Sequence, residues 1–133
     1  GDQADAAFWA VFFRENGPVD IVIDDGGHLP NQQSVTLEAV LPMIRPGGIY
    51  LCEDICNKDN AFAAFAGGLI QALNHYRYNP DNERQVVASS WQAAVKAIHC
   101  YPYVLVIEKN EIPITCLQCP KQGTQWQPFF ENR

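Results

Sequence analysis

The stretch Val19-Asp-Ile-Val-Ile-Asp-Asp-Gly-Gly-His28 decides the fold that we predict for this 133-residue chain. Its first five residues are nearly all apolar and β-branched, a pattern typical of a strand covered on both faces in a parallel sheet. Asp24 and Asp25 stand where this strand should end. The two glycines after them permit a sharp turn that lets His28 face back over the acids. We therefore predict a strand with ionisable groups at its carboxyl end.

A second stretch, Gly47-Gly-Ile-Tyr-Leu-Cys-Glu-Asp54, repeats this design, because its apolar run ends in Glu53 and Asp54. Between the two stretches, Asn31 or Ser34 opens a helical pattern. Its apolar positions recur at helical spacing and are Leu37, Val40, Leu41 and Ile44. A strand–helix–strand order predicts two parallel neighbouring strands joined by a right-handed crossover.

Polar groups converge at one end of this predicted sheet. They are Asp24, Asp25, His28, Glu53 and Asp54. In open α/β sheets the carboxyl ends of the strands form the crevice in which ligands bind. Crowded carboxylates stay ionised together only where a cation or buried hydrogen bonds compensate their charges, and oxygen ligands of this kind suit Mg²⁺. The alternative is that the acids cap the following turn and that His28 is a polar loop residue.

Helices are predicted on either side of this unit. Asp5 is a candidate N-cap for a helix that places Phe8, Val11 and Phe12 on one face, and Gly17 can end it with a left-handed residue. Pro42 should kink the central helix or end it early. A third helix follows Asn60, and its apolar residues are Phe62, Phe65, Ala66, Leu69 and Leu73.

The remainder of the chain carries a polar loop, a hairpin and a tail. Residues 79–84 are polar and predict a loop, while Val95–Cys100 and Tyr103–Lys109 read as two strands joined by a short turn. Beyond Glu111 the pattern fades, and prolines punctuate the tail. His75 and His99 lack a cluster of acids in the sequence and are interpreted as structural.

Composition narrows the classes of partner. A formal charge of −6 and a pI near 4.8 speak against nucleic acid and anionic membranes. No apolar run approaches the roughly 18–20 residues of a membrane span, and no signal peptide opens the chain, so a cytoplasmic location is expected. The five cysteines cannot all pair within the chain. Cys116 and Cys119 have the spacing of a zinc knuckle, with free thiols or a local disulfide as the alternatives.

Three segments together carry a family resemblance. Gly1-Asp-Gln-Ala-Asp5, Val19–His28 and Arg45-Pro-Gly-Gly-Ile-Tyr-Leu-Cys-Glu-Asp54 resemble the carboxyl-terminal half of class I S-adenosylmethionine-dependent methyltransferases. The branch that they resemble is the metal-dependent O-methyltransferases of the mycinamicin and macrocin type. The resemblance runs to about residue 55 and resumes near residues 95–109. It implies an α/β fold: a partial Rossmann-like sheet of two parallel strands and a C-terminal antiparallel hairpin, with flanking helices.

The resemblance also implies a cofactor set and roles for individual residues. The ligands of Mg²⁺ would be Asp25, Glu53 and Asp54. His28 would be the general base that takes the proton of a sugar-like hydroxyl acceptor. Asp2 and Gln3 would contact the adenine end of S-adenosylmethionine.

The glycine-rich cofactor loop and the ribose-binding acid of this family lie upstream of the segment that matches Gly1–Asp5. We therefore expect residues 1–133 to form one domain, an incomplete methyltransferase fold that does not bind S-adenosylmethionine tightly. Two functions follow as hypotheses. The first is the acceptor-side half of a metal-dependent O-methyltransferase; the alternative is a catalytically inactive remnant that acts as a homo-oligomeric structural or binding module.

The strand at Val19–Asp24 would be central in the complete family fold, and here one of its edges would lack a partner. An apolar strand with an open edge is prone to pair with another chain. The tail is too rich in proline to serve as a strand partner. We therefore predict a twofold homodimer, with the aromatic side chains of residues 8–12 close to the junction.

Overall fold

The computed structural model describes residues 1–56, 59–75 and 86–117. Over these residues the chain forms the elements α1 (Ala6–Asn16), β1 (Val19–Asp24), α2 (Pro30–Val40), the 3₁₀ turn η1 (Leu41–Met43), β2 (Ile44–Cys52), α3 (Ala61–Leu73), β3 (Val86–Val87), α4 (Ser90–Ala94), β4 (Val95–Tyr101), β5 (Val104–Lys109) and β6 (Cys116–Leu117). The polar loop predicted at residues 79–84, Cys119 and the tail beyond residue 117 lie outside the described residues.

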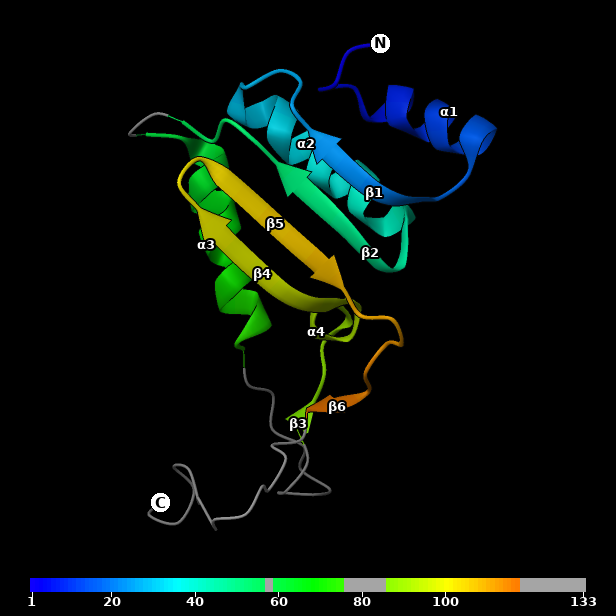
Figure 1. Cartoon of the computed structure of the whole chain (residues 1–133), viewed down its shortest axis with the longest axis vertical. Helices are drawn as coiled ribbons and strands as arrows, with labels where there is room; N and C mark the ends of the chain where they lie inside the picture. Colours follow the sequence, from blue (N-terminus) through cyan, green and yellow to red (C-terminus); the bar gives the residue numbers. More distant parts are fainter. Residues whose placement is uncertain (57–58, 76–85, 118–133) are drawn as a thin grey trace.

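The main sheet has four strands in the order β1-β2-β5-β4 (Figure 1). β1 and β2 are parallel, whereas β5 runs antiparallel to both β2 and β4. The predicted topology of two parallel strands and a carboxyl-terminal hairpin is therefore confirmed. A second, two-stranded sheet of β3 and β6 was not predicted.

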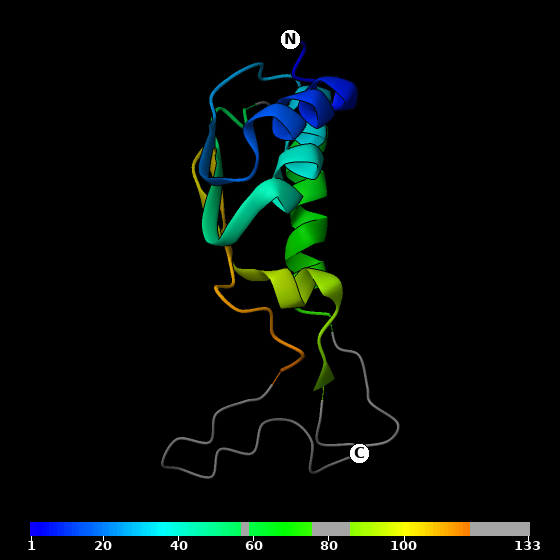
Figure 2. The same ribbon diagram turned by 90° about the vertical axis from the view of Figure 1, so that its right-hand side faces the viewer.

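The helices lie on one side of the main sheet (Figure 2). Alternate strand residues face this helical layer and are buried, among them Tyr50, Cys52, Leu105 and Ile107. They form the core together with Phe13, Leu37, Val40, Ile44, Phe62, Ala66 and Val95. The opposite face is open at β1, where Ile21 and Ile23 are each 63% exposed. The expectation that β1 is covered on both faces is therefore wrong for the described residues, because the helices cover only one of them.

The ends of α1 follow the sequence prediction, but its buried face does not. Asp5 Oδ1 accepts a hydrogen bond from the amide of Ala7 in the first turn, and Gly17 ends the helix with φ +73°. Phe13 is the buried residue of this helix, whereas Val11 is 41% exposed. Three phenylalanines in six residues offer more than one apolar face, and packing against α2 selects the face that contains Phe13.

The crossover helix starts and stops at prolines. α2 begins at Pro30, earlier than Asn31 or Ser34, because proline is well suited to the first turn of a helix. It ends at Val40, and the turn with Pro42 is 3₁₀, so the predicted early end is confirmed. None of the described helices is long and apolar enough to cross a membrane.

Candidate functional site

The site is built where β1 and β2 end side by side. Asp24 is opposite Cys52 in the parallel register, and the Glu53 amide donates to the Asp24 carbonyl at 2.9 Å. This hydrogen bond continues the pairing to the last residue of β1. Asp25 follows Asp24, and Asp54 follows Glu53. Both residues therefore leave the sheet at the same edge.

Three ionisable side chains meet at this edge. Asp25, His28 and Asp54 each offer a potential ligand atom, and these atoms lie within 4.8 Å of one another. His28 Nε2 is 3.7 Å from Asp25 Oδ1 and 3.6 Å from Asp54 Oδ2. All three side chains are exposed to solvent. Asp54 has φ +52°, a left-handed conformation that aspartate adopts more readily than most residues.

The donor set fits a divalent cation. Ligand oxygens lie about 2.1 Å from Mg²⁺ in an octahedral shell, so neighbouring ligand atoms are about 3.0 Å apart. The carboxylate oxygens of Asp25 and Asp54 lie within 4.8 Å of each other, so a side-chain movement of up to about 1.8 Å would bring them to this spacing. Carboxylate oxygens are the ligands that Mg²⁺ prefers, whereas an imidazole nitrogen suits softer metals. Asp25 and Asp54 are thus the better ligands, and His28 remains available for a proton.

Glu53 is placed differently from the other predicted ligands. It is half-buried, and it does not belong to the group formed by Asp25, His28 and Asp54. Its carbonyl accepts a hydrogen bond of 3.1 Å from Gln33 Nε2, which comes from α2. Its backbone is therefore tied to the helical layer, and a metal-ligand role for its carboxylate stays a prediction.

Asp24 lies behind the exposed group and is only 7% exposed. Its Oδ2 accepts a hydrogen bond from the Tyr50 hydroxyl at 3.0 Å, and its Oδ1 accepts one from Gln3 Nε2 at 2.6 Å. Burial raises the pKa of Asp24, although the hydrogen bonds from Tyr50 and Gln3 act in the opposite direction. Burial likewise raises the pKa of Tyr50, and it raises the pKa of Cys52 to about 12. Asp24 is therefore a structural carboxyl group beneath the site rather than a ligand within it.

The two residues expected at the cofactor are Asp2 and Gln3. Asp2 is exposed, and its Oδ1 accepts a hydrogen bond from the Ala4 amide at 2.9 Å, so it shapes the turn before α1. Gln3 reaches across to the acids, and its Oε1 accepts from the Gly27 amide at 2.6 Å. A contact of either residue with the adenine of a cofactor stays a prediction.

A shallow hollow of about 330 Å³ lies beside these residues, and Gln3, Asp25 and Gly26 all line it. Its other lining residues include Phe8 and Trp9 of α1 and Val22 of β1. A ligand in this hollow would therefore contact both the aromatic rings of Phe8 and Trp9 and the turn that contains Asp25 and Gly26.

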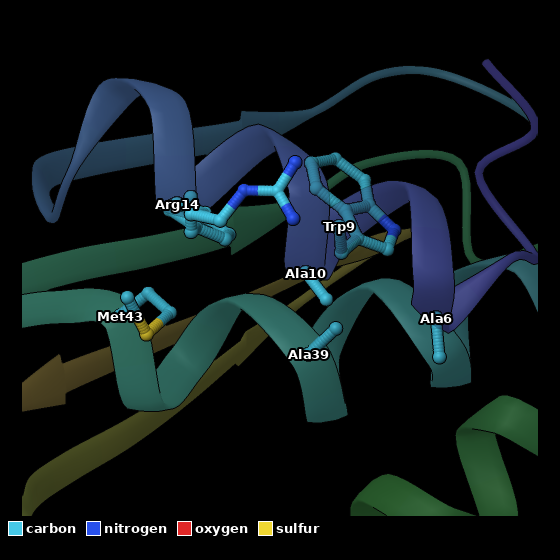
Figure 3. Close-up of a pocket in the computed structure, with 7 residues that line it drawn as sticks. Ala6, Trp9, Ala10, Arg14, Ala39 and Met43 are labelled. Atoms are coloured by element: carbon cyan, nitrogen blue, oxygen red, sulfur yellow. The ribbon is translucent and has the colours of Figure 1, made fainter.

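A larger pocket of about 450 Å³ lies between α1 and α2 (Figure 3). Small residues line it from both helices, Ala6 and Ala10 from α1 and Ala39 from α2, and Trp9 and Arg14 project from α1. It contains no acid and no histidine. The pocket therefore does not offer the metal-binding and proton-accepting side chains that Asp25, His28 and Asp54 provide.

Two buried residues of the site were missed from the sequence. Tyr50 is fully buried, and its signal was a tyrosine in an otherwise aliphatic strand, because a buried tyrosine hydroxyl needs an acceptor. Gln33 is also buried, in a helix that was read only for its apolar stripe. His99 was interpreted as structural, and the sequence did not reveal its partner across the hairpin: Glu108 Oε1 lies 2.8 Å from its Nε2.

Comparison with known proteins identifies relatives of this chain. No family model matches it. The mycinamicin VI 2''-O-methyltransferase of Micromonospora griseorubida is 47% identical over an alignment of length 126 that covers 83% of this chain and 31% of the relative. A tetracenomycin rhamnosyl 3'-O-methyltransferase of Streptomyces olivaceus is 44% identical and aligns with 100% of this chain and 35% of its own length.

Solved structures give the same result. The mycinamycin-pathway methyltransferase MycE, in complex with Mg and S-adenosylhomocysteine, matches 83% of this chain and 31% of its own chain with a TM-score of 0.67 and 28% identity. A further structure of MycE, which also contains mycinamycin VI, matches with a TM-score of 0.66. This chain spans about a third of the length of these relatives. The resemblance read from the sequence is thus confirmed.

Proposed function

Because the chain is homologous to the O-methyltransferases that act on antibiotic sugars, we propose that it is the acceptor-side part of a metal-dependent O-methyltransferase. The observation that carries this proposal is the convergence of Asp25, His28 and Asp54 at adjacent strand ends. S-adenosylmethionine would be the methyl donor and Mg²⁺ the metal, as the contents of the related MycE structures suggest. The acceptor would be a hydroxyl group on the sugar of a glycosylated small molecule.

Asp25 and Asp54 would hold the cation, with Glu53 as the third predicted ligand. When bound, Mg²⁺ acidifies an acceptor hydroxyl and S-adenosylmethionine supplies an electrophilic methyl group. Asp25 and Asp54 also lie near the same ring nitrogen, 3.7 and 3.6 Å from His28 Nε2. Their negative charges would stabilise the ring once Nε2 has taken a proton.

His28 Nε2 would accept the proton that the acceptor hydroxyl loses. In the complete reaction an oxygen–carbon bond forms, the carbon–sulfur bond of the donor breaks, and the hydroxyl proton passes to His28. The exposure of His28 at the strand ends leaves room for a bulky glycoside. Asp2 and Gln3 would contact the adenine end of the donor at the hollow beside Phe8 and Trp9. We propose that these contacts alone hold the donor weakly.

A metal titration tests the site. Isothermal titration with Mg²⁺ and Mn²⁺ should show binding that is lost in the double variant Asp25→Asn, Asp54→Asn. Asp20→Asn is a matched control, because Asp20 is an exposed acid of β1 whose Oδ2 pairs with Arg45 at 2.8 Å, away from the group. A wild-type chain without measurable cation binding would contradict the proposed site.

A second variant separates the role of a base from that of a ligand. His28→Asn should keep the cation affinity of the wild type and abolish methyl transfer from S-adenosylmethionine to a rhamnoside probe. A variant that loses cation affinity would instead make His28 a metal ligand. Methyl transfer that persists in His28→Asn would remove it from catalysis.

The open face of the sheet favours a second function. Ile21 and Ile23 are 63% exposed on β1, an edge strand of the described sheet. We propose that a second copy of the chain covers this edge in a homodimer. The alternative to the enzyme is therefore a catalytically inactive module that acts through this interface. We also propose a cytoplasmic location, because an odd number of cysteines suits a reducing compartment.

A further inference from the structure

The turn after β1 carries Asp25 and His28, and one side chain from outside β1 anchors it. Gln3 Nε2 donates to Asp24 Oδ1 at 2.6 Å, and Gln3 Oε1 accepts from the Gly27 amide at 2.6 Å. The amide group of Gln3 thus connects the last residue of β1 to the third residue after it. Asp25 lies inside this bridged segment, and His28 follows it directly.

Gln3 is itself fixed by the helical layer. Its carbonyl accepts a hydrogen bond from Trp9 Nε1 of α1 at 3.0 Å, and Thr36 Oγ1 of α2 approaches the same carbonyl at 3.5 Å. On the far side of the bridge, Asp24 is held by the hydroxyl of Tyr50, which is fully buried in β2. The bridge therefore connects the acid turn to both α1 and the core of the sheet.

The glycine at position 26 leaves room for this bridge. A Cβ atom at Gly26 would lie 2.5 Å from Gln3 Oε1 and 3.4 Å from Asp24 Oδ1. The first distance is shorter than a van der Waals contact, so the amide of Gln3 would have to move. The close approach of Gln3 to the turn thus depends on the absence of a side chain there.

We propose that Gln3 is a positioning residue that sets the orientation of Asp25 and His28 through Asp24 and Gly27. The proposal rests on the proposed function only in treating this turn as the carrier of a cation ligand and a base. Asp54 follows β2 and lies outside this turn, so the separation of 3.6 Å between Asp54 Oδ2 and His28 Nε2 depends on where the turn is held. Loss of the bridge would widen that separation without removing any ligand.

The first test needs no metal. In the full chain, ¹⁵N relaxation would give the order parameters of Asp25 and His28, and amide exchange would report on Gly27. Gln3→Ala should speed exchange at Gly27 about 10-fold and lower the order parameters from about 0.85 to below about 0.6. Order parameters that stay at the wild-type value would overturn the proposal.

Gln92→Ala is the matched control for a purely structural glutamine. Gln92 is 2% exposed, and its Nε2 donates to the carbonyls of Leu73 and His75 at 2.9 and 2.8 Å. The variant removes comparable buried hydrogen bonds outside the acid turn. It should lower stability and leave the order parameters of Asp25 and His28 unchanged. A similar loss of order in both variants would reduce the effect of Gln3→Ala to general destabilisation and overturn the proposal.

The second test uses Mn²⁺ as a paramagnetic probe, with free ion measured by electron paramagnetic resonance. Gln3→Ala should weaken Mn²⁺ binding about 10-fold, the size of effect that outer-shell partners of metal ligands have elsewhere. Gln92→Ala should stay within twofold of the wild type. Equal affinities of Gln3→Ala and the wild type would count against positioning. A wild type that binds no Mn²⁺ would contradict the proposed function, and the relaxation experiment would still decide the role of Gln3.

Gly26→Ala gives the same answer if Gln3→Ala does not fold. This variant keeps the glutamine and displaces its amide from the turn, because the new Cβ would lie 2.5 Å from Oε1. It should reproduce the faster exchange at Gly27 and the loss of order at His28. Wild-type order in Gly26→Ala would refute the proposal.

Discussion

Tyr50→Phe removes one hydroxyl from the centre of the molecule and tests the burial of Asp24 directly. Both residues are buried, and the hydroxyl donates to Asp24 Oδ2 at 3.0 Å. A hydrogen bond to a charged group contributes about 1.5–3 kcal/mol to stability, and a buried acceptor left without its donor costs a similar amount. Phenylalanine preserves the ring, so packing changes little. We therefore expect the free energy of unfolding to fall by about 2–3 kcal/mol at neutral pH.

The effect should depend on pH in a defined direction. Burial raises the pKa of Asp24 above its ordinary value of 3.8, so the folded protein holds this proton more readily than the unfolded chain. The contribution of Asp24 to stability is thus most favourable below pH 3.8 and declines as the pH rises through the folded-state pKa. The Tyr50 hydrogen bond lowers that pKa, so Tyr50→Phe should raise it and extend the decline to higher pH. The difference between variant and wild type should therefore shrink on acidification.

Urea unfolding followed by tryptophan fluorescence, in EDTA and at several pH values, measures both effects. Tyr101→Phe is the control, because Tyr101 is 60% exposed on the hairpin and its loss should change stability by less than about 0.5 kcal/mol. A Tyr50→Phe variant as stable as Tyr101→Phe at neutral pH would refute the reasoning. A difference that does not change with pH would show that Asp24 is not the group affected.

Three other outcomes are expected. Burial raises the pKa of Cys52 to about 12. A thiol reagent at pH 8 should therefore modify the exposed Cys100 and react with Cys52 only after unfolding. Rapid labelling of Cys52 in the folded chain would contradict its burial. Asp5→Ala removes the N-cap of α1 and should lower the free energy of unfolding by about 1 kcal/mol, whereas Asp5→Asn should keep most of it; equal losses in urea unfolding would exclude capping. Ile21→Lys should convert the proposed dimer to a monomer in sedimentation experiments, while a dimer that persists would place the interface elsewhere.

The sheet was predictable because its signals are local. The runs that end in Asp24 and Glu53 are continuous in sequence, and the pattern between them fixes a parallel crossover before any contact is known. The edge at which their acids meet follows from the same rule. The approach of Asp25 to Asp54 could therefore be anticipated from sequence alone.

The support beneath the site could not be predicted, because it depends on register between distant segments. Tyr50 meets Asp24 across 26 positions, and Gln3 meets it across 21. A shift of one residue between β1 and β2 would place these side chains on opposite faces of the sheet. The open face was equally hidden, since Ile21 is as apolar as a core residue and only the distribution of helices leaves it exposed.

The hydrogen bond from the Glu53 amide to the Asp24 carbonyl fixes the distance between the two backbone segments that carry the site. Paired strands lie about 4.8 Å apart whatever their sequence, so the backbone segments before Asp25 and Asp54 are held at about this separation. As the proposed cation ligands, the carboxylates of Asp25 and Asp54 would start from this fixed backbone separation, and their side chains would have to supply the rest of the reach to a shared ion. Exchanging Asp25 or Asp54 for glutamate would lengthen the reach of that side chain but leave the backbone separation unchanged.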